Sequence, residues 1–100
     1  MQATLQKSTR KDKRYMVQLQ TPDGIYTIHF GSPMHANFTT HRDPKRRDLY
    51  IARHAKRENW EDPTTPGFWS RWLLWEEPHL GDAMKPLERK GVKVRISKHK

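Results

Sequence analysis

The chain has 100 residues, of which twenty are Lys or Arg and eleven are Asp or Glu, giving a net charge of +9 and an isoelectric point near 10.2. This length suits one small domain, and the lack of cysteine excludes disulfides and thiolate metal sites. No apolar run approaches the roughly 20 residues that cross a bilayer, and the first residues lack a signal-peptide stretch. We therefore expect a protein that is neither transmembrane nor secreted.

The positive charge is concentrated in three blocks. Residues 1–14 carry five basic groups, and residues 41–58 and 85–100 carry seven each, whereas residues 59–84 hold only one basic group against five acidic ones. A basic surface attracts polyanions, namely nucleic acid, membrane head groups or acidic protein. Alternating blocks suit a bridge between unlike partners, although net charge can also serve solubility alone.

The first third of the chain predicts an arm followed by a hairpin. Residues 1–13 are polar and without period, which indicates a flexible basic arm. Residues 14–20 alternate between apolar and polar side chains, and residues 25–30 are rich in β-branched and aromatic types, so both stretches are expected to be strands. The intervening Thr-Pro-Asp-Gly at 21–24 has turn chemistry.

The middle of the chain predicts a loop and a basic helix. Gly, Pro and Asn in residues 31–42 favour an irregular loop, after which Asp43-Pro44 has the character of a helix start. Good helix formers continue to about Asn59, with a thin apolar edge and a broad basic face. This helix is the best functional candidate, because its cations can reach phosphates.

The last third predicts a tryptophan-rich helix and a final strand. Thr65-Pro66 repeats the cap-and-proline signal, and a helix should run from Phe68 to about Glu76, with a further helical turn or two in residues 80–90. Residues 92–96 alternate and predict a strand with a cationic outer face, followed by a basic tail at 97–100. The expected core side chains are aromatic: Trp60, Phe68, Trp69, Trp72 and Trp75.

These elements predict an α+β fold in β-β-α-α-β order. Residues 14–96 would form a single domain, with the final strand pairing with an edge of the hairpin and the tryptophan helix covering its apolar face. The predicted contacts to a polyanion or partner protein come from the basic helix and the final strand: Arg42, Lys45, Arg46, Arg53, Lys56, Arg57, Lys93 and Arg95.

Metal and catalytic sites are weakly supported. His29, His35 and His41 are six residues apart, whereas compact zinc sites pair ligands two to five apart. Ser70 lacks the glycine-framed turn of a nucleophile, and the acidic groups of residues 58–62 more plausibly offset the neighbouring arginines. We expect no enzyme activity, cofactor, metal or small-molecule substrate. An enzyme would instead show metal-dependent turnover sensitive to His54 or Glu58.

One long segment is distinctive: Tyr50–His54 reads Tyr-Ile-x-Arg-His, residues 58–65 read Glu-x-Trp-x-Asp-Pro-x-Thr, and residues 67–75 read Gly-Phe-Trp-Ser-x-Trp-Leu-Leu-Trp. Together with His-Phe-Gly at 29–31 and Thr-His at 40–41, this pattern resembles an uncharacterised family of small basic proteins of large double-stranded DNA viruses. The resemblance covers roughly residues 15–80. It transfers no catalytic residue.

The resemblance implies a protein that is made in the host cytoplasm and then enters the virion. We therefore expect a non-enzymatic minor capsid or core component that bridges acidic partners, which are other virion proteins, with membrane head groups also possible. The alternative is a DNA- or RNA-binding protein without sequence preference.

Overall fold

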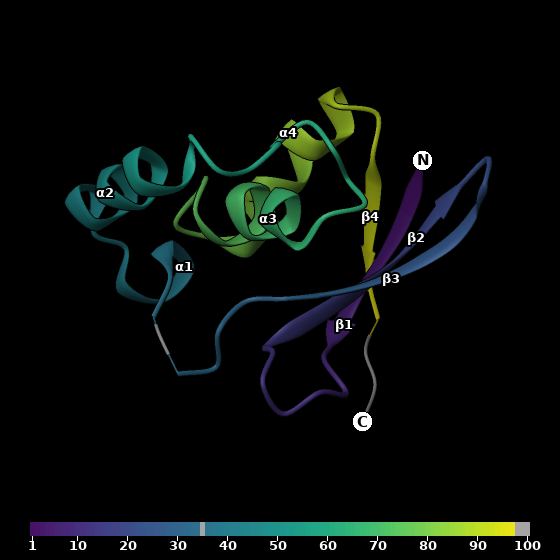
Figure 1. The fold of residues 1–100 in the computed structure, drawn as a ribbon, viewed down its shortest axis with the longest axis horizontal. Helices are drawn as coiled ribbons and strands as arrows, with labels where there is room; N and C mark the ends of the chain where they lie inside the picture. The colour runs from purple at the N-terminus through teal and green to yellow at the C-terminus, as the bar shows by residue number, and fades with distance from the viewer. Residues whose placement is uncertain (35, 98–100) are drawn as a thin grey trace.

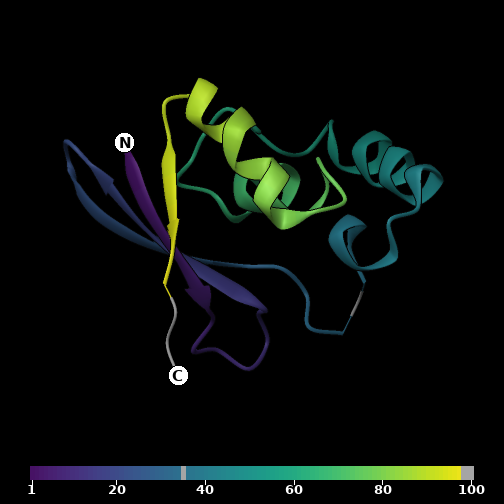
Figure 2. The ribbon, with the colours of Figure 1, turned by 180° about the vertical axis from the view of Figure 1, so that it is seen from behind.

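A four-stranded sheet forms the base of the molecule, and helices cover one of its faces (Figure 1, Figure 2). The structure is a computed structural model that describes residues 1–34 and 36–97. The strands are β1 (Gln2–Lys7), β2 (Tyr15–Thr21), β3 (Gly24–Phe30) and β4 (Lys93–Ile96), in the spatial order β3-β2-β1-β4. The predicted α+β class is confirmed.

The predicted hairpin is present, and the predicted arm is wrong. β2 and β3 pair antiparallel, with Thr21 opposite Gly24 across the Pro-Asp turn. Residues 2–7, expected to be flexible, form β1, which pairs antiparallel with β2 and parallel with β4. Residues 2–7 form a strand because Ala3 and Leu5, two residues apart, point to the same face of the sheet. Each is only 2 % exposed, so this face of the otherwise polar stretch is buried.

The sequence predicts that the final strand pairs with an edge of the hairpin. This prediction is wrong, because β4 pairs with β1. Backbone hydrogen bonds fasten it at both ends, from Lys93 N–H to the Met1 carbonyl and from Ser97 N–H to the Leu5 carbonyl, each at 2.8 Å. The N-terminal amine of Met1 donates to the Gly91 carbonyl at 2.7 Å. The predicted tail begins at Ser97, and its residues 98–100 lie outside the described part of the chain.

The helical layer has six short segments. They are α1 (Phe38–His41), α2 (Pro44–His54), α3 (Pro66–Trp69), the π-helical turn η1 (Ser70–Leu74), the 3-10 turn η2 (Leu80–Ala83) and α4 (Met84–Arg89). The basic helix starts at its predicted cap but ends at His54, five residues before the predicted end. The loop predicted over residues 31–42 contains α1, whose first turn is closed by a capping box at Asn37.

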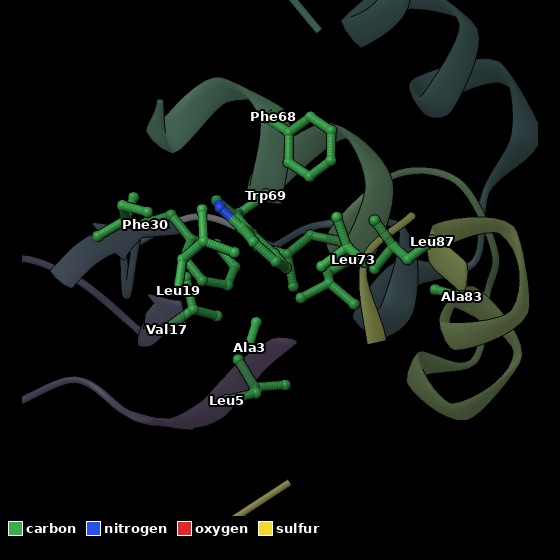
Figure 3. Packing of buried hydrophobic residues seen from close by; sticks show 13 residues of the cluster. Ala3, Leu5, Val17, Leu19, Phe30, Phe68, Trp69, Leu73, Ala83 and Leu87 are labelled. Carbon is green, nitrogen blue, oxygen red and sulfur yellow. The ribbon is translucent and has the colours of Figure 1, made fainter. Parts of the chain in front are cut away.

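The core lies between the sheet and the segment α3–η1. In Figure 3, Leu5, Val17 and Leu19 of the strands point toward Trp69 and Leu73, and Leu87 of α4 closes the side. Trp69 and Leu73 are fully buried. The indole Nε1 of Trp69 donates to the Pro63 carbonyl at 2.7 Å, so the large ring is buried without an unpaired donor.

The aromatic core predicted for this segment is partly wrong. Of its four predicted core residues, Phe68 and Trp69 are buried, whereas Trp72 and Trp75 are not fully buried. The π-helical turn widens the helix at Ser70–Leu74, so the residues after it are displaced from α-helical spacing. Trp72 and Trp75 consequently lie at the edge of the core, where they are partly buried.

Trp60 lies outside the hydrophobic cluster. Its indole Nε1 donates to Glu58 Oε2 at 2.8 Å, and its carbonyl accepts from Trp72 Nε1 at 2.8 Å. The Arg71 guanidinium carbon lies 5.2 Å from the centre of the Trp60 ring and 4.4 Å from that of Trp72. The segment before α3 is therefore fastened by polar and cation–π contacts, so Trp60 is not a core residue.

Candidate polyanion-binding surface

Helix α2 stands beside the rest of the helical layer, beyond the end of the sheet (Figure 1). The Asp43 side chain caps it by accepting from Lys45 N–H at 3.0 Å, and Pro44 occupies the first turn. None of its residues is buried, and Leu49 is 60 % exposed. Burial of apolar surface therefore does not explain how α2 is held.

Arg47 provides the first attachment of α2. Its Nε donates to the carbonyls of Trp75 at 2.9 Å and Glu76 at 3.1 Å, and its Nη2 contacts Glu76 Oε1 at 2.8 Å. The same carboxylate oxygen accepts from Arg71 Nη1 at 2.7 Å. Burial raises the pKa of Glu76, but the hydrogen bonds and charges of Arg71 and Arg47 outweigh burial, so the pKa lies below its ordinary value.

Tyr50 provides the second attachment. Its ring lies parallel to the Trp75 ring, with centroids 4.2 Å apart, and its other face is covered by His54 at 4.4 Å. Burial, followed by the charge of Glu58, raises the pKa of Tyr50 well above its ordinary value, so its hydroxyl remains a neutral donor at physiological pH.

The corner between α1 and α2 fixes the direction of the basic helix. Arg42 adopts the left-handed conformation at φ 55° and ends α1. The Asp43 N–H donates to His41 Nδ1 at 2.9 Å, and burial, followed by the charge of Arg46, lowers the pKa of His41. The ring is therefore neutral at physiological pH and serves as an acceptor.

None of the eight predicted cations forms an ion pair among the described residues. Arg42 differs slightly, because its Nε donates to the Pro78 carbonyl at 3.4 Å. The other predicted cations on and after α2 are exposed and take no part in the ion pairs found in residues 1–34 and 36–97: Lys45, Arg46, Arg53, Lys56 and Arg57. Arg47, which is not among the predicted binding residues, is the cation that attaches the helix.

Lys93 and Arg95 form a second basic region. Both are exposed, and they lie opposite Gln2 and Thr4 of β1. Figure 1 shows β4 and α2 at well-separated positions in the molecule, and Figure 2 shows the same separation from behind. The predicted binding residues therefore form two separate surfaces.

A groove of about 570 Å³ lies between α2 and the body of the molecule. Arg46, Leu49 and Arg53 of α2 line one side, and Lys13 contributes a third cation. Lys13 is not among the predicted binding residues, because the polar character of residues 1–13 predicts a flexible arm. No local signal connects this lysine with α2, since only the pairing of β1, β2 and β3 brings the two regions together.

Gly31, at the end of β3, lets the chain approach this groove closely. It has φ +83°, and an added Cβ would lie 3.0 Å from Leu74 Cδ1 and 3.3 Å from Arg14 Cβ. A side chain here would be strained by the backbone conformation and crowded by its neighbours. Glycine therefore allows β3 to lead directly into the segment that carries α1 and α2.

Two further histidines have local partners. His29 Nδ1 lies 2.8 Å from Ser8 Oγ, and His54 Nδ1 lies 3.8 Å from Glu58 Oε1. Within the described residues, no three side chains of His, Asp or Glu converge as metal ligands, and no helix is long and apolar enough to span a membrane. His35, one of the three histidines considered from the sequence, lies outside the described residues.

Comparison with known proteins identifies one family. Residues 3–54, more than half of the chain, match DUF5754, which is described as a family of unknown function. The matched stretch contains β1 except Gln2, the whole of β2, β3, α1 and α2, and it ends before the tryptophan-rich segment. No curated protein and no solved structure matches the chain.

Proposed function

Because the chain belongs to DUF5754, a family of unknown function, we propose its function from its own surface: it binds the phosphate backbone of nucleic acid without reading the sequence, and it is not an enzyme. The observation that carries this proposal is the exposed set of five cations on and after α2 that form no ion pair within the described residues. Phosphate contacts release condensed counterions, which favours binding by such a surface.

The way α2 is attached supports this role. Arg47 and Tyr50 hold one side of the helix against Trp75 and Glu76, so the cations on its other sides stay available. The helix contains no Asn or Gln, the side chains that read adenine by paired hydrogen bonds. Its acidic neighbours Glu58 and Glu76 are occupied by Trp60 and by two arginines, which favours a binding role over an acid–base one.

The test is the salt dependence of binding to a labelled DNA duplex, measured by fluorescence anisotropy. The wild-type affinity should fall linearly with salt on a log–log plot, and the variant Arg46→Ala/Arg53→Ala/Arg57→Ala should lower the slope by about 2.7 if each arginine meets one phosphate. Duplexes of unrelated sequence should bind alike. An unchanged slope would exclude α2 as the contact.

A second candidate function is favoured by the separation of Lys93 and Arg95 from α2 (Figure 1). A small protein with two distant basic surfaces can contact two acidic partners at once, so we also propose a minor structural component of a DNA virus particle that bridges virion proteins or membrane head groups. Fractionation of purified particles tests this candidate. Release with the shell at fixed stoichiometry supports it, and absence from particles rejects it.

A further inference from the structure

We propose that the groove between α2 and the body binds a single-stranded segment of nucleic acid. This inference rests on the function proposed above and specifies the form of the ligand. The groove has a volume of about 570 Å³, within the usual range for a ligand site. A double helix, whose major groove alone is about 12 Å wide, is too bulky to enter it, so a duplex would meet the exposed Arg46 and Arg53 only from outside the groove.

The charge of the groove suits a phosphodiester chain. Arg46 and Arg53 lie two turns apart on α2, about 10.5 Å along the helix axis, and Lys13 adds a cation from the connection between β1 and β2. Glu58 is the one carboxylate among the described lining residues, and it already accepts from Trp60 Nε1. Asp48, the acidic residue of α2, does not line the groove.

Tyr50 adds an uncharged donor to this set. It lines the groove, and its hydroxyl has no hydrogen-bond partner among the described residues. Because the phenol keeps its proton at physiological pH, it can donate to an anionic oxygen placed beside the two arginines.

The apolar part of the groove explains why a single strand fits better than phosphate alone. Leu49 is 60 % exposed and lies between Arg46 and Arg53 in the sequence of α2. Unpaired bases present apolar faces that a duplex hides. Both faces of the Tyr50 ring are covered by Trp75 and His54, so a base would contact Leu49 and the ring edges, which gives no preference for sequence.

The experiment compares two double variants that remove the same charge. Arg46→Ala/Arg53→Ala removes two groove cations, and Lys45→Ala/Arg57→Ala removes two cations of the same segment that do not line the groove. Affinity and salt slope are measured by anisotropy for a labelled thymidine oligonucleotide and for a DNA duplex. Melting temperatures of all variants check that these exposed substitutions leave the fold intact.

For the thymidine oligonucleotide, the groove pair should lower the salt slope by about 1.4, the value for two lost single-strand contacts, and the control pair should change it much less. For the duplex, the groove pair should have no larger effect than the control pair. Leu49→Ala should weaken single-strand binding several-fold without changing the salt slope, because it removes an apolar contact and no charge.

Equal effects of the two pairs on the single strand would overturn the groove site while leaving nucleic-acid binding by α2 intact. Failure of the wild type to bind either nucleic acid would instead reject the proposed function itself. Polyglutamate serves as the competing probe. If it bound as tightly as the oligonucleotide and lost affinity in the groove pair, the groove would be a site for acidic protein.

Discussion

Two helical segments meet at Trp75, and the molecule holds them by different kinds of contact. The segment α3–η1 buries Phe68, Trp69 and Leu73 against the sheet, whereas α2 buries no residue. Helix α2 is attached through the Arg47 guanidinium and the Tyr50 ring. Burial of large apolar side chains contributes most of the stability of a small domain, and directional contacts fix a position at modest net gain.

This difference places the residues that stabilise the fold and the residues of the proposed binding surface in different segments of one small chain. A helix attached through one polar and aromatic side keeps its other sides free for a partner, which a helix buried like α3 does not. Substitutions in the core should therefore change the free energy of unfolding, and substitutions on the exposed sides of α2 should change binding alone.

The largest effect is expected at Trp69, which is fully buried. Trp69→Ala should reduce the free energy of unfolding by about 3–5 kcal/mol, because it leaves a cavity between the sheet and α3. Chemical denaturation measures this loss. Trp60→Ala is the matched control, since Trp60 lies outside the hydrophobic cluster and should cost less. A smaller loss at Trp69 than at Trp60 would contradict the assigned core.

The next effect tests the strand that the sequence presented as an arm. Leu5→Ala should cost about 2–5 kcal/mol, because Leu5 is 2 % exposed in an inner strand of the sheet. Thr4→Ala, on the opposite face of β1, should change the unfolding free energy by less than about 1 kcal/mol. Equal, small effects of both changes would mean that residues 2–7 do not belong to the fold.

The hairpin and the start of α2 could be predicted because their signals are local. A Pro-Asp-Gly turn between two alternating segments predicts β2 and β3, and Asp43-Pro44 predicts the first turn of α2. The strand β1 gives a weak signal of only two alternating apolar residues, Ala3 and Leu5. Its place in the sheet depends on partners that are 8 to 18 residues away in β2 and 91 residues away in β4.

The candidate site was predictable in its charge but not in its shape. The cations of α2 are evident from the composition of residues 42–57. The role of Arg47 was not, because nothing in the sequence distinguishes this arginine from Arg46 beside it. The sequence does not predict the π-helical turn either. This turn positions Trp75 at the edge of the core, where Tyr50 stacks on it.

A third prediction concerns Glu76, which joins the two segments by accepting from both Arg47 and Arg71. Glu76→Gln should cost about 1–3 kcal/mol at neutral pH, because it leaves the buried Arg71 without its counter-charge. Since the pKa of Glu76 is lowered in the folded protein, its stabilising contribution is present above the ordinary value of 4.5 and is lost as the pH falls through the folded pKa.

Unfolding free energies measured from about pH 6 down to about pH 2.5 check this sign. The wild type should lose stability across the acidic part of that range, and Glu76→Gln should lose less, since its amide does not titrate. Parallel pH profiles of the two proteins would show that protonation of Glu76 does not cause the loss of stability at acidic pH.

The smallest effect on stability is expected at Arg53. Measuring Arg53→Ala beside Arg47→Ala compares an exposed arginine of α2 with the arginine that attaches the helix. Both are arginines of α2, but Arg47 donates to Trp75 and Glu76, and Arg53 has no ion pair within the described chain. Arg47→Ala should cost about 1–3 kcal/mol, and Arg53→Ala less than about 0.5 kcal/mol. Thermal unfolding measures both.

Duplex binding should give the complementary result for the Arg53 substitution. Arg53→Ala should lower the salt slope by about 0.9, the value for one lost phosphate contact, although it hardly changes the melting temperature. If Arg53→Ala destabilised the protein as much as Arg47→Ala, the exposed face of α2 would be part of the structure and not a free binding surface. If Arg53→Ala leaves the protein stable and reduces the salt dependence, then different side chains of α2 serve different roles. Arg47 and Tyr50 would attach the helix to the body, and the exposed arginines would bind nucleic acid.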